Sequence, residues 1–326
     1  MNSSKLWPCA ALPHASLAPR TTLHVGGRAE WLLEPATPEE LRRAIVAARE
    51  DGHEPRILGG GANLIVDDGV LPGVVITTDR MKRLFRPANA AAWLADDPDG
   101  RVAQPSREEG LRFVSWAGTT HQKLLSASVE LGWSGLEGLA GVPGHVGGGV
   151  AMNAGGKWGG MWDAVERVLV VDERGELVEL ERAQCQPRYR NGGLGRNVVA
   201  SVLLRFTLDT LPAVKERARE FLLAKNRVQP VTLWSAGCIF KNPDPSVSGG
   251  RTAGQLVDAC GLKGARLGDA EISPLHGNFF VNRGNARARD LLALIERARA
   301  EVAERTGIVL EHEVKVWRAE LDPARP

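Results

Sequence analysis

Two arginines flank the only tyrosine of the chain, in the segment 187–191. Arg190, beside the hydroxyl of Tyr189, could bind a carboxylate or a phosphate, because a guanidinium offers several N–H donors in a fixed planar fork. An ordinary surface loop explains the same residues equally well. The pair is therefore a candidate anion site that needs support from other segments.

A second candidate group lies in the segment 235–243, SAGCIFKNP. Gly237 leaves access to the thiol of Cys238, and Lys241 and Asn242 add a cation and an amide before a proline. Such a turn could hold an anion and present a proton to it. A lone cysteine is more often a small buried apolar residue than a reactive one, so both interpretations stand here.

The third candidate group is acidic and lies in the segment 309–317, VLEHEVKVW. Strand alternation predicts one apolar face and one charged face. The apolar face holds Leu310, Val314 and Val316, and the charged face holds Glu311, Glu313 and Lys315. A charged face that is merely solvated is the more common case.

Two glycine-rich loops point to a phosphate-bearing ligand. The segment 135–156, GLEGLAGVPGHVGGGVAMNAGG, has nine glycines in 22 positions, and LGGGAN follows a predicted strand at 58–63. Glycine costs backbone entropy on folding, so such a density favours close approach of bare N–H groups to a ligand. Two loops could hold one extended dinucleotide at two points. A cluster of tight turns without a ligand is the alternative.

Neither loop has the spacing of the common nucleotide-binding motifs. Asn63 leads into the strand-like LIV instead of a helix, and the chain contains no GK[ST] sequence. The sequence therefore disfavours a Rossmann fold and a P-loop.

Helix and strand patterns alternate along the chain and would position these groups. Thr37 and Glu40 predict a capping box, with Pro38 at the first helical position, for a helix that stops at Gly52. Further helices are predicted at 121–132, 212–228 and 286–307, a hairpin at 164–182, and strands at 29–35, 55–58, 64–66, 74–78, 112–120, 198–208, 278–282 and 308–317. No fixed-period repeat is present.

Length and composition bound the answer further. A chain of 326 residues is longer than a single hydrophobic core usually supports, so more than one domain is expected. The predicted domains are 1–80, 81–211 and 212–326, with a surface excursion at 86–110. Lys and Arg number 41 against 39 Asp and Glu, which argues against nucleic-acid and membrane partners. The four cysteines lack metal or disulfide spacing, so no metal is expected. No signal peptide or membrane span is expected, which favours a cytoplasmic protein.

Taken in order, the motifs resemble those of the UDP-N-acetylenolpyruvoylglucosamine reductase family. They are LGGGAN, GLEGLAGVPGHVGG, MNAGG, YRN, SAGCIFKNP, AGQLVDACGLKG, HGNFFVN and LEHEV, over roughly residues 20–317. The short separation of Arg190 from Cys238 resembles the shorter, type II subclass. The resemblance implies an α+β fold of the vanillyl-alcohol-oxidase (PCMH) type. In it, two FAD-binding subdomains, 1–80 and 81–211, are followed by an α+β substrate-binding domain at 212–326.

The resemblance also implies an activity and roles for individual residues. The expected reaction reduces UDP-N-acetylglucosamine enolpyruvate to UDP-N-acetylmuramate in peptidoglycan precursor synthesis, with non-covalent FAD, NADPH as electron donor and a monomeric enzyme. Arg190 matches the family's catalytic arginine, Cys238 its proton donor and Glu313 its catalytic glutamate. Hydride would pass from flavin N5 to carbon 3 of the substrate, and a proton from Cys238 to carbon 2.

Other positions are expected to bind the ligands. The residues that match substrate-binding positions are Tyr189, Lys241 and Asn242. Those that match FAD-binding positions are Leu58, Gly59, Gly60, Gly61, Ala62, Asn63, Ala117, Gly118, Gly141, Val142, Pro143, Gly144, His145, Gly147, Gly148, Asn153 and Lys315.

The chain departs from the family pattern at four places. Cys238 stands where serine is usual, His145 interrupts the usual GTVGG or GSVGG, Asn191-Gly192 replaces the serine end of YR-x-S, and Lys315 stands where some members have arginine. A thiol of pKa ~8.5 is mostly protonated at neutral pH, although a nearby Arg190 would favour the thiolate. We expect burial and Glu313 to keep it protonated.

Two other functions fit the same scaffold. A flavin-dependent oxidase would take electrons from an alcohol and pass them to oxygen, and several such oxidases tether flavin through a histidine in the first glycine loop. Here that loop reads Gly61-Ala62-Asn63. A catalytically silent nucleotide-binding homologue is the second alternative, and retention of Arg190, Cys238 and Glu313 together argues against it.

Overall fold

The computed structural model describes residues 6–87 and 110–319, so nearly all of the excursion predicted at 86–110 lies outside the described residues. The chain forms two compact units. Unit 1 consists of Met1–Ala11, Leu33–Gly60 and Val74–Leu223, and unit 2 of Leu12–Leu32, Gly61–Gly73 and Ala224–Pro326. The sequence places boundaries near 80 and 211. In the structure two early segments instead group with the C-terminal part, because they supply strands and core residues to it.

The first sheet contains the strands at which the chain crosses between the units. Its order is β1 (Ala10–Ser16), β2 (Arg28–Glu34), β5 (Val70–Thr77) and β3 (Arg56–Leu58), with β3 parallel to β5. Helix α1 (Pro38–Glu50) begins as predicted, with the Thr37 hydroxyl accepting from the Glu40 N–H at 3.1 Å. The carboxylate of Glu40 accepts from Ala36 N–H at 2.8 Å instead of from Thr37, so the reciprocal capping box is not formed.

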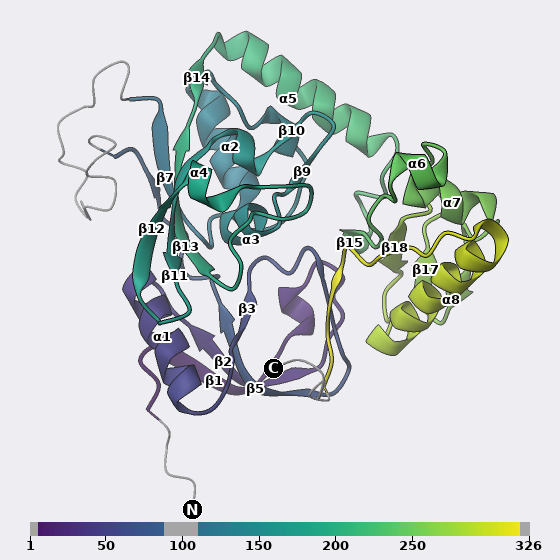
Figure 1. Cartoon of the computed structure of the whole chain (residues 1–326), viewed down its shortest axis with the longest axis horizontal. Coiled ribbons are helices and arrows are strands. Elements are labelled where there is room, and N and C mark those ends of the chain that lie inside the picture. Colours follow the sequence, from purple (N-terminus) through teal and green to yellow (C-terminus); the bar gives the residue numbers. More distant parts are fainter. Residues whose placement is uncertain (1–5, 88–109, 320–326) are drawn as a thin grey trace, which may run out of the picture. The chain divides into compact units, whose positions relative to one another are not determined.

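Unit 1 is built on a five-stranded antiparallel sheet (Figure 1). The strand order is β12 (Leu177–Glu181), β11 (Val165–Val171), β13 (Val198–Arg205), β7 (Arg112–Trp116) and β6 (Leu84–Phe85). The hairpin predicted at 164–182 is confirmed as β11 and β12. Phe113 packs on Trp133 and Phe206 in the core, with ring centroids 4.8 and 5.6 Å away.

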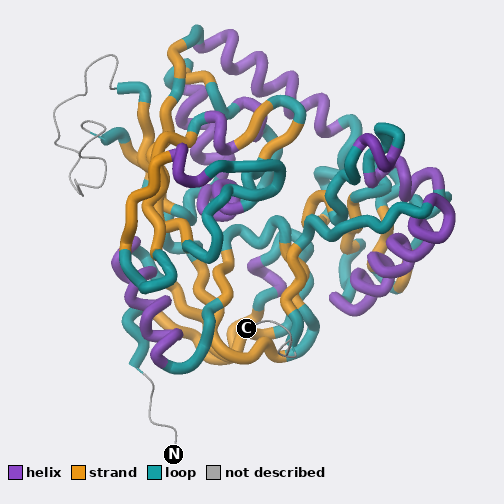
Figure 2. The backbone as a smooth tube through the Cα atoms, viewed as in Figure 1, coloured by secondary structure: helices purple, strands orange, loops and turns teal. Residues whose placement is uncertain are grey.

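Short elements complete unit 1. Helices are α2 (His121–Glu130), α3 (Val146–Ala151) and α4 (Arg182–Cys185), with 3-10 turns at Glu137–Leu139 and Met161–Asp163. Short strand pairs are β8 (Trp133–Ser134) with β14 (Thr207–Leu208), and β9 (Gly155–Gly156) with β10 (Gly159–Gly160). Figure 2 shows helices and strands mixed along both units, as the sequence pattern predicts.

Unit 2 has an antiparallel sheet and a parallel strand pair. The sheet order is β15 (Trp234–Cys238), β18 (Phe279–Asn282), β17 (Ala270–Ile272) and β16 (Arg266–Leu267), and β4 (Leu64–Val66) runs parallel to β19 (Lys315–Trp317). Its helices are α6 (Pro245–Ser248), α7 (Ala253–Ala259) and α8 (Ala288–Thr306), and α5 (Leu211–Asn226) leads into it. A 3-10 turn lies at Ala18–Arg20. No described helix is long and apolar enough to cross a membrane.

The strand predicted at 308–317 is wrong in extent. Only Lys315–Trp317 is regular strand, because its partner β4 is equally short. The predicted alternation still holds in burial, since Leu310 and Val314 are 1% and 3% exposed while Glu311 faces solvent. Upstream of β19 the backbone pairs through a single bridge between His312 and Phe240.

Candidate functional site

In unit 1, Gly59 and Gly60 of the first glycine loop lie beside the second glycine loop. A Cβ on Gly60 would lie 2.8 Å from the Cα of Gly144 and 3.1 Å from the ring of His145. A Cβ on Gly59 would lie 3.9 Å from the Gly148 nitrogen, whereas a Cβ on Gly148 would meet no atom within 4 Å. The loops therefore press together at Gly60 and leave bare, exposed backbone at Gly148. This arrangement fits a ligand whose phosphates are bound by main-chain N–H groups.

The end of β7 supports the second glycine loop. The N–H groups of Gly147 and Val146 donate to the carbonyls of Ala117 and Thr119 at 2.9 and 2.8 Å, and His121 N–H donates back to the Gly144 carbonyl at 3.0 Å. A Cβ on Gly147 would lie 2.8 Å from that of Ala117. The positions predicted for FAD at Ala117 and at Gly144–Gly147 thus form one hydrogen-bonded ladder.

Two buried histidines, His121 and His145, belong to the backbone segments of this ladder. His121 is 3% exposed and His145 is 7% exposed, and among residues 6–87 and 110–319 neither ring nitrogen of His121 has a hydrogen-bond partner. Burial lowers the pKa of His121 to about 4, although the nearby Val142 carbonyl opposes this. Burial also lowers the pKa of His145, against the attraction of Asp79, whose carboxylate lies 3.7 Å from His145 Nε2. Both rings are therefore neutral at neutral pH.

Arg190 lies in a tight turn of unit 1. Arg188 and Asn191 exchange backbone hydrogen bonds of 2.7 and 3.1 Å, which makes Tyr189 and Arg190 the two central residues. Arg190 has a φ of +53°, a conformation that glycine or asparagine usually supplies at this position of a turn. Its Nη1 donates to the Gly155 carbonyl at 3.0 Å, and its guanidinium lies 5.0 Å from the ring centroid of the exposed Tyr189.

Cys238 and Glu313 lie on neighbouring backbone segments of unit 2. The carbonyl of Ile239, the residue after Cys238, accepts from the N–H of Glu313 at 2.8 Å. The pairing of β15 with β18 shifts between Ser235 and Cys238, where Gly237 has a φ of +75°. Such an irregularity changes the direction of the next side chain. Cys238 is half-buried and is not part of a disulfide.

The end of the first glycine loop joins the same part of unit 2. The amide of Asn63 donates to the Glu313 carbonyl at 3.1 Å, and Lys315 N–H donates to the Asn63 carbonyl at 3.1 Å. Asn63 and Cys238, which are distant in sequence, are therefore both brought beside the segment of Glu313 and Lys315 in unit 2. Arg190 belongs to unit 1.

The two residues predicted for substrate in this unit have protein partners. Lys241 Nζ lies 3.1 Å from a Glu311 carboxylate oxygen, and both side chains are exposed. The amide oxygen of Asn242 accepts from Ala253 N–H at 3.1 Å, at the first turn of α7. An exposed ion pair of this kind is weak, so Lys241 could exchange Glu311 for an anionic ligand at little cost.

Sequence reasoning missed Asn278, which fixes the backbone just after β15 and Cys238. Asn278 is 2% exposed, and its amide both accepts from Phe240 N–H at 2.9 Å and donates to the Phe240 carbonyl at 2.8 Å. The signal available was an asparagine next to the apolar run of HGNFFVN, since a buried amide must be hydrogen-bonded.

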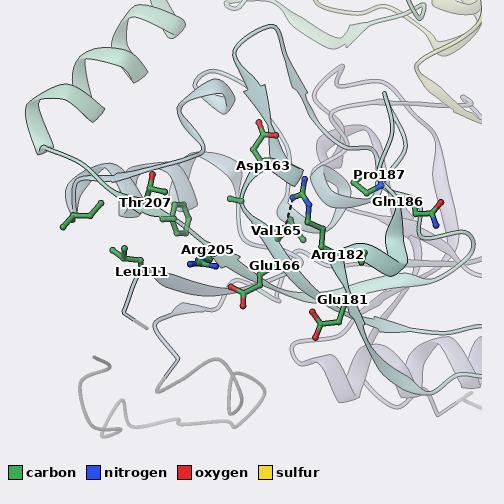
Figure 3. Close-up of a pocket in the computed structure, with 14 residues that line it drawn as sticks. Leu111, Asp163, Val165, Glu166, Glu181, Arg182, Gln186, Pro187, Arg205 and Thr207 are labelled. Atoms are coloured by element: carbon green, nitrogen blue, oxygen red, sulfur yellow. Dashed lines mark hydrogen bonds between the residues drawn. The ribbon is translucent and has the colours of Figure 1, made fainter. Parts of the chain in front are cut away.

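A surface hollow elsewhere in unit 1, of about 1150 Å³, contains none of the predicted site residues (Figure 3). Several of its polar groups already have partners within the fold. Glu166 pairs with Arg112 at 2.8 Å, Asp163 accepts from Gly160 N–H, and Arg182 donates to the Val165 carbonyl. In the described residues, no group of three His, Cys, Asp or Glu side chains could hold a metal ion.

Comparison with known proteins identifies the family. The FAD binding domain family matches residues 29–181, and the C-terminal domain family of UDP-N-acetylenolpyruvoylglucosamine reductase matches residues 229–317. The UDP-N-acetylenolpyruvoylglucosamine reductase of Moorella thermoacetica is 37% identical over 94% of this chain and 93% of its own. The chain belongs to the UDP-N-acetylenolpyruvoylglucosamine reductase family.

Further members of the family agree. The protein of that name from Deinococcus radiodurans is 38% identical over 96% of this chain and 98% of its own. The crystal structure of the reductase (MurB) from Thermus caldophilus has a TM-score of 0.72 at 36% identity, covering 94% of this chain and 98% of that chain. The predicted fold class, an FAD-binding α+β fold followed by the family's C-terminal domain, is confirmed. The chain is an oxidoreductase of this FAD-dependent family.

Proposed function

We propose that the protein reduces UDP-N-acetylglucosamine enolpyruvate to UDP-N-acetylmuramate with FAD and NADPH, for peptidoglycan precursor synthesis. The observation that carries the proposal is the 37% identity to a named reductase over 94% of this chain, with both domain families matched in order. The proposal includes a monomeric, cytoplasmic enzyme that acts on a small nucleotide sugar.

The glycine loops are the proposed FAD phosphate site. The pyrophosphate would be bound by the backbone N–H groups near Gly59, Gly60, Gly144 and Gly148. The backbone at Gly148 is open enough for this, because a Cβ added there would meet no atom within 4 Å. When bound and reduced by NADPH, FAD would supply the hydride that the substrate gains at carbon 3, and would return to its oxidised form. The neutral His145 beside these loops adds no positive charge at neutral pH, so backbone dipoles would supply the attraction.

The side chains of Arg190, Glu313 and Cys238 would complete the reduction. Hydride addition at carbon 3 pushes an electron pair toward carbon 2 and the substrate carboxylate. Arg190 would pair with that carboxylate, and Glu313 would help to hold the enolic form. The Cys238 thiol would then give its proton to carbon 2, and the thiolate would regain a proton from solvent. The backbone hydrogen bond between Glu313 and Ile239, the neighbour of Cys238, supports a shared role for Glu313 and Cys238.

An anaerobic titration tests the reaction. NADPH should bleach the flavin absorbance, and added UDP-N-acetylglucosamine enolpyruvate should restore it. Cys238→Ser should remain active, because a hydroxyl can carry the same proton. Cys238→Ala should slow substrate-driven reoxidation by ~10²–10⁴, the usual contribution of a general acid, and leave reduction by NADPH unchanged.

Two outcomes would count against the proposal. Normal reoxidation of Cys238→Ala would remove the thiol from the mechanism. Recovery of the flavin with oxygen and not with the enolpyruvate would point to an oxidase instead.

A further inference from the structure

The turn that carries Arg190 is held against the last part of the second glycine-rich segment, at the end of α3 and just after it. The Asn153 amide donates to the Arg188 carbonyl at 3.0 Å, and Gly192 N–H donates to the Ala151 carbonyl at 2.9 Å. Arg190 Nη1 closes the third contact, to the Gly155 carbonyl at 3.0 Å. All of these residues belong to unit 1.

Asn153 also ends the helix that begins in the glycine loop. Helix α3 starts after His145, its C-cap is Met152, and Asn153 follows with a φ of +45°. Asparagine is one of the few residues that adopt this left-handed conformation easily after a helix. The same backbone geometry that stops α3 therefore places the Asn153 amide beside the Arg188 carbonyl.

The turn itself needs outside support. Arg190 has a φ of +53° where glycine or asparagine is favoured, and such a conformation persists only where surrounding contacts determine it. The Asn153 amide bonds the same carbonyl that closes the turn by accepting from Asn191 N–H. Without that amide, the turn would keep fewer contacts to hold the strained arginine.

We propose that Asn153 is a positioning residue that fixes the Arg190 turn relative to the end of α3, and so sets where the guanidinium meets an anionic substrate. The proposal rests on the proposed function for the role of Arg190. It differs from the expectation that Asn153 contacts FAD, because here its amide group acts on the arginine turn.

The test uses two variants that keep the backbone conformation. Asn153→Gly tolerates the positive φ and removes the amide, and Asn153→Asp replaces the donor with an oxygen facing the Arg188 carbonyl. Gln186→Gly is the matched control, since Gln186 has a φ of +48° and precedes the same turn. Each is compared with Arg190→Met and with the double variant Asn153→Gly/Arg190→Met.

Hydrogen exchange measures positioning without reference to activity. In both Asn153 variants the amides of Asn191 and Gly192, which donate to Arg188 and Ala151, should exchange about tenfold faster, while Gln186→Gly should match the wild type. Unchanged exchange at both amides would overturn the proposal.

Kinetics of the flavin-loaded enzyme measure the consequence. Asn153→Gly should slow substrate-driven reoxidation by about 10- to 100-fold, with FAD affinity and reduction by NADPH within about twofold of wild type. In the Arg190→Met background the same change should have little further effect, because coupled residues are not additive. Equal losses in both backgrounds, or weakened FAD binding, would overturn the proposal. Normal reoxidation in Arg190→Met, with faster exchange in Asn153→Gly, would instead remove Arg190 from the proposed function and leave the positioning intact.

Discussion

His121 makes the stability of unit 1 depend on pH. Its pKa is about 4 in the fold against an ordinary value of 6.5, because burial disfavours the charged ring. Between these values the unfolded chain binds a proton that the folded chain does not. The stabilising contribution is complete above pH 6.5 and is lost as pH falls toward about 4, by up to ~1.4 kcal/mol for each pH unit.

The variant His121→Gln removes this titration and tests the argument. Its free energy of unfolding should be lower than that of the wild type at pH 7.5, and the difference should narrow as pH falls from 6.5 toward 4. Urea denaturation of both proteins over this range gives the measurement. A difference that stays constant with pH would show that His121 titrates normally in the fold.

Candidate site residues are easiest to predict where they stand in short, contiguous motifs. Arg190, Cys238 and Glu313 were predictable as candidates because each stands in a short recognisable segment. The hydrogen bonds from Asn153 to Arg188 and from Asn278 to Phe240 join residues 35 and 38 positions apart. Such pairs leave no periodic pattern, so the positioning of the candidates could not be predicted from the chain alone.

At the scale of elements, one substitution in each glycine loop separates the effect on stability from the effect on FAD binding. A Cβ on Gly60 would lie 2.8 Å from the Gly144 Cα, so Gly60→Ala should push the loops apart and lower the thermal stability of the apoprotein. A Cβ on Gly148 meets nothing within 4 Å, and alanine favours the helix α3. Gly148→Ala should therefore keep apoprotein stability and weaken FAD binding by about tenfold or more, because the proposed pyrophosphate site uses the open backbone at this position.

The control for these two is Gly156→Ala. Its Cβ also meets nothing within 4 Å, and it lies in β9 at the far end of the second glycine-rich segment, beyond α3, so both stability and flavin affinity should stay at the wild-type level. Thermal unfolding of the apoprotein and fluorescence titration with FAD separate the effects. Normal FAD affinity in Gly148→Ala would exclude the loop backbone at that position from the cofactor site.

Helix α8 depends on a cap supplied from another part of the chain. No side chain of its own N-cap residue bonds the first turn, and the Asp68 carboxylate accepts from the N–H groups of Ala288 and Arg289 at 2.9 and 3.2 Å. A negative carboxylate at the N-terminus of a helix also interacts favourably with the helix dipole. Asp68→Ala should lower the free energy of unfolding by about 1–2 kcal/mol, and Asp68→Asn by less. Equal stability of Asp68→Ala and wild type in urea denaturation would contradict this role.

Elements with strong periodicity were predictable, and short ones were not. The region predicted as α1 is marked by its capping threonine and its apolar stripe, and the region predicted as α8 is marked by its apolar stripe. Helix α3 was missed because three of its six residues are glycine, a poor helix former, and tertiary hydrogen bonds hold it instead. Strands β16 and β17 have two and three residues, too few for an alternating pattern.

At the scale of the whole molecule, unit 2 is assembled from three separate stretches of chain. Leu23, Val25 and Ile65 belong to the same core as Phe240 and Phe280, and β19 pairs only with β4 among the described residues. The C-terminal stretch therefore lacks part of its core and the partner of its last strand when it stands alone. Sequence patterns could not reveal this, because contiguous segments suggest contiguous domains.

A fragment of residues 224–326 should consequently fail to fold cooperatively. Leu23, Val25 and Ile65 are at most 2% exposed in the whole chain, so the fragment would expose the apolar surface that they cover. Exposing apolar surface to water lowers the free energy of unfolding by about 25 cal/mol for each Å². The fragment should unfold over a broad temperature range by circular dichroism, with poorly dispersed amide signals. Adding segments 12–32 and 61–73 through short linkers should restore a sharp transition, because these segments return the missing core residues and strand β4. A sharp transition in the bare fragment would show that the early segments are dispensable for the fold of unit 2.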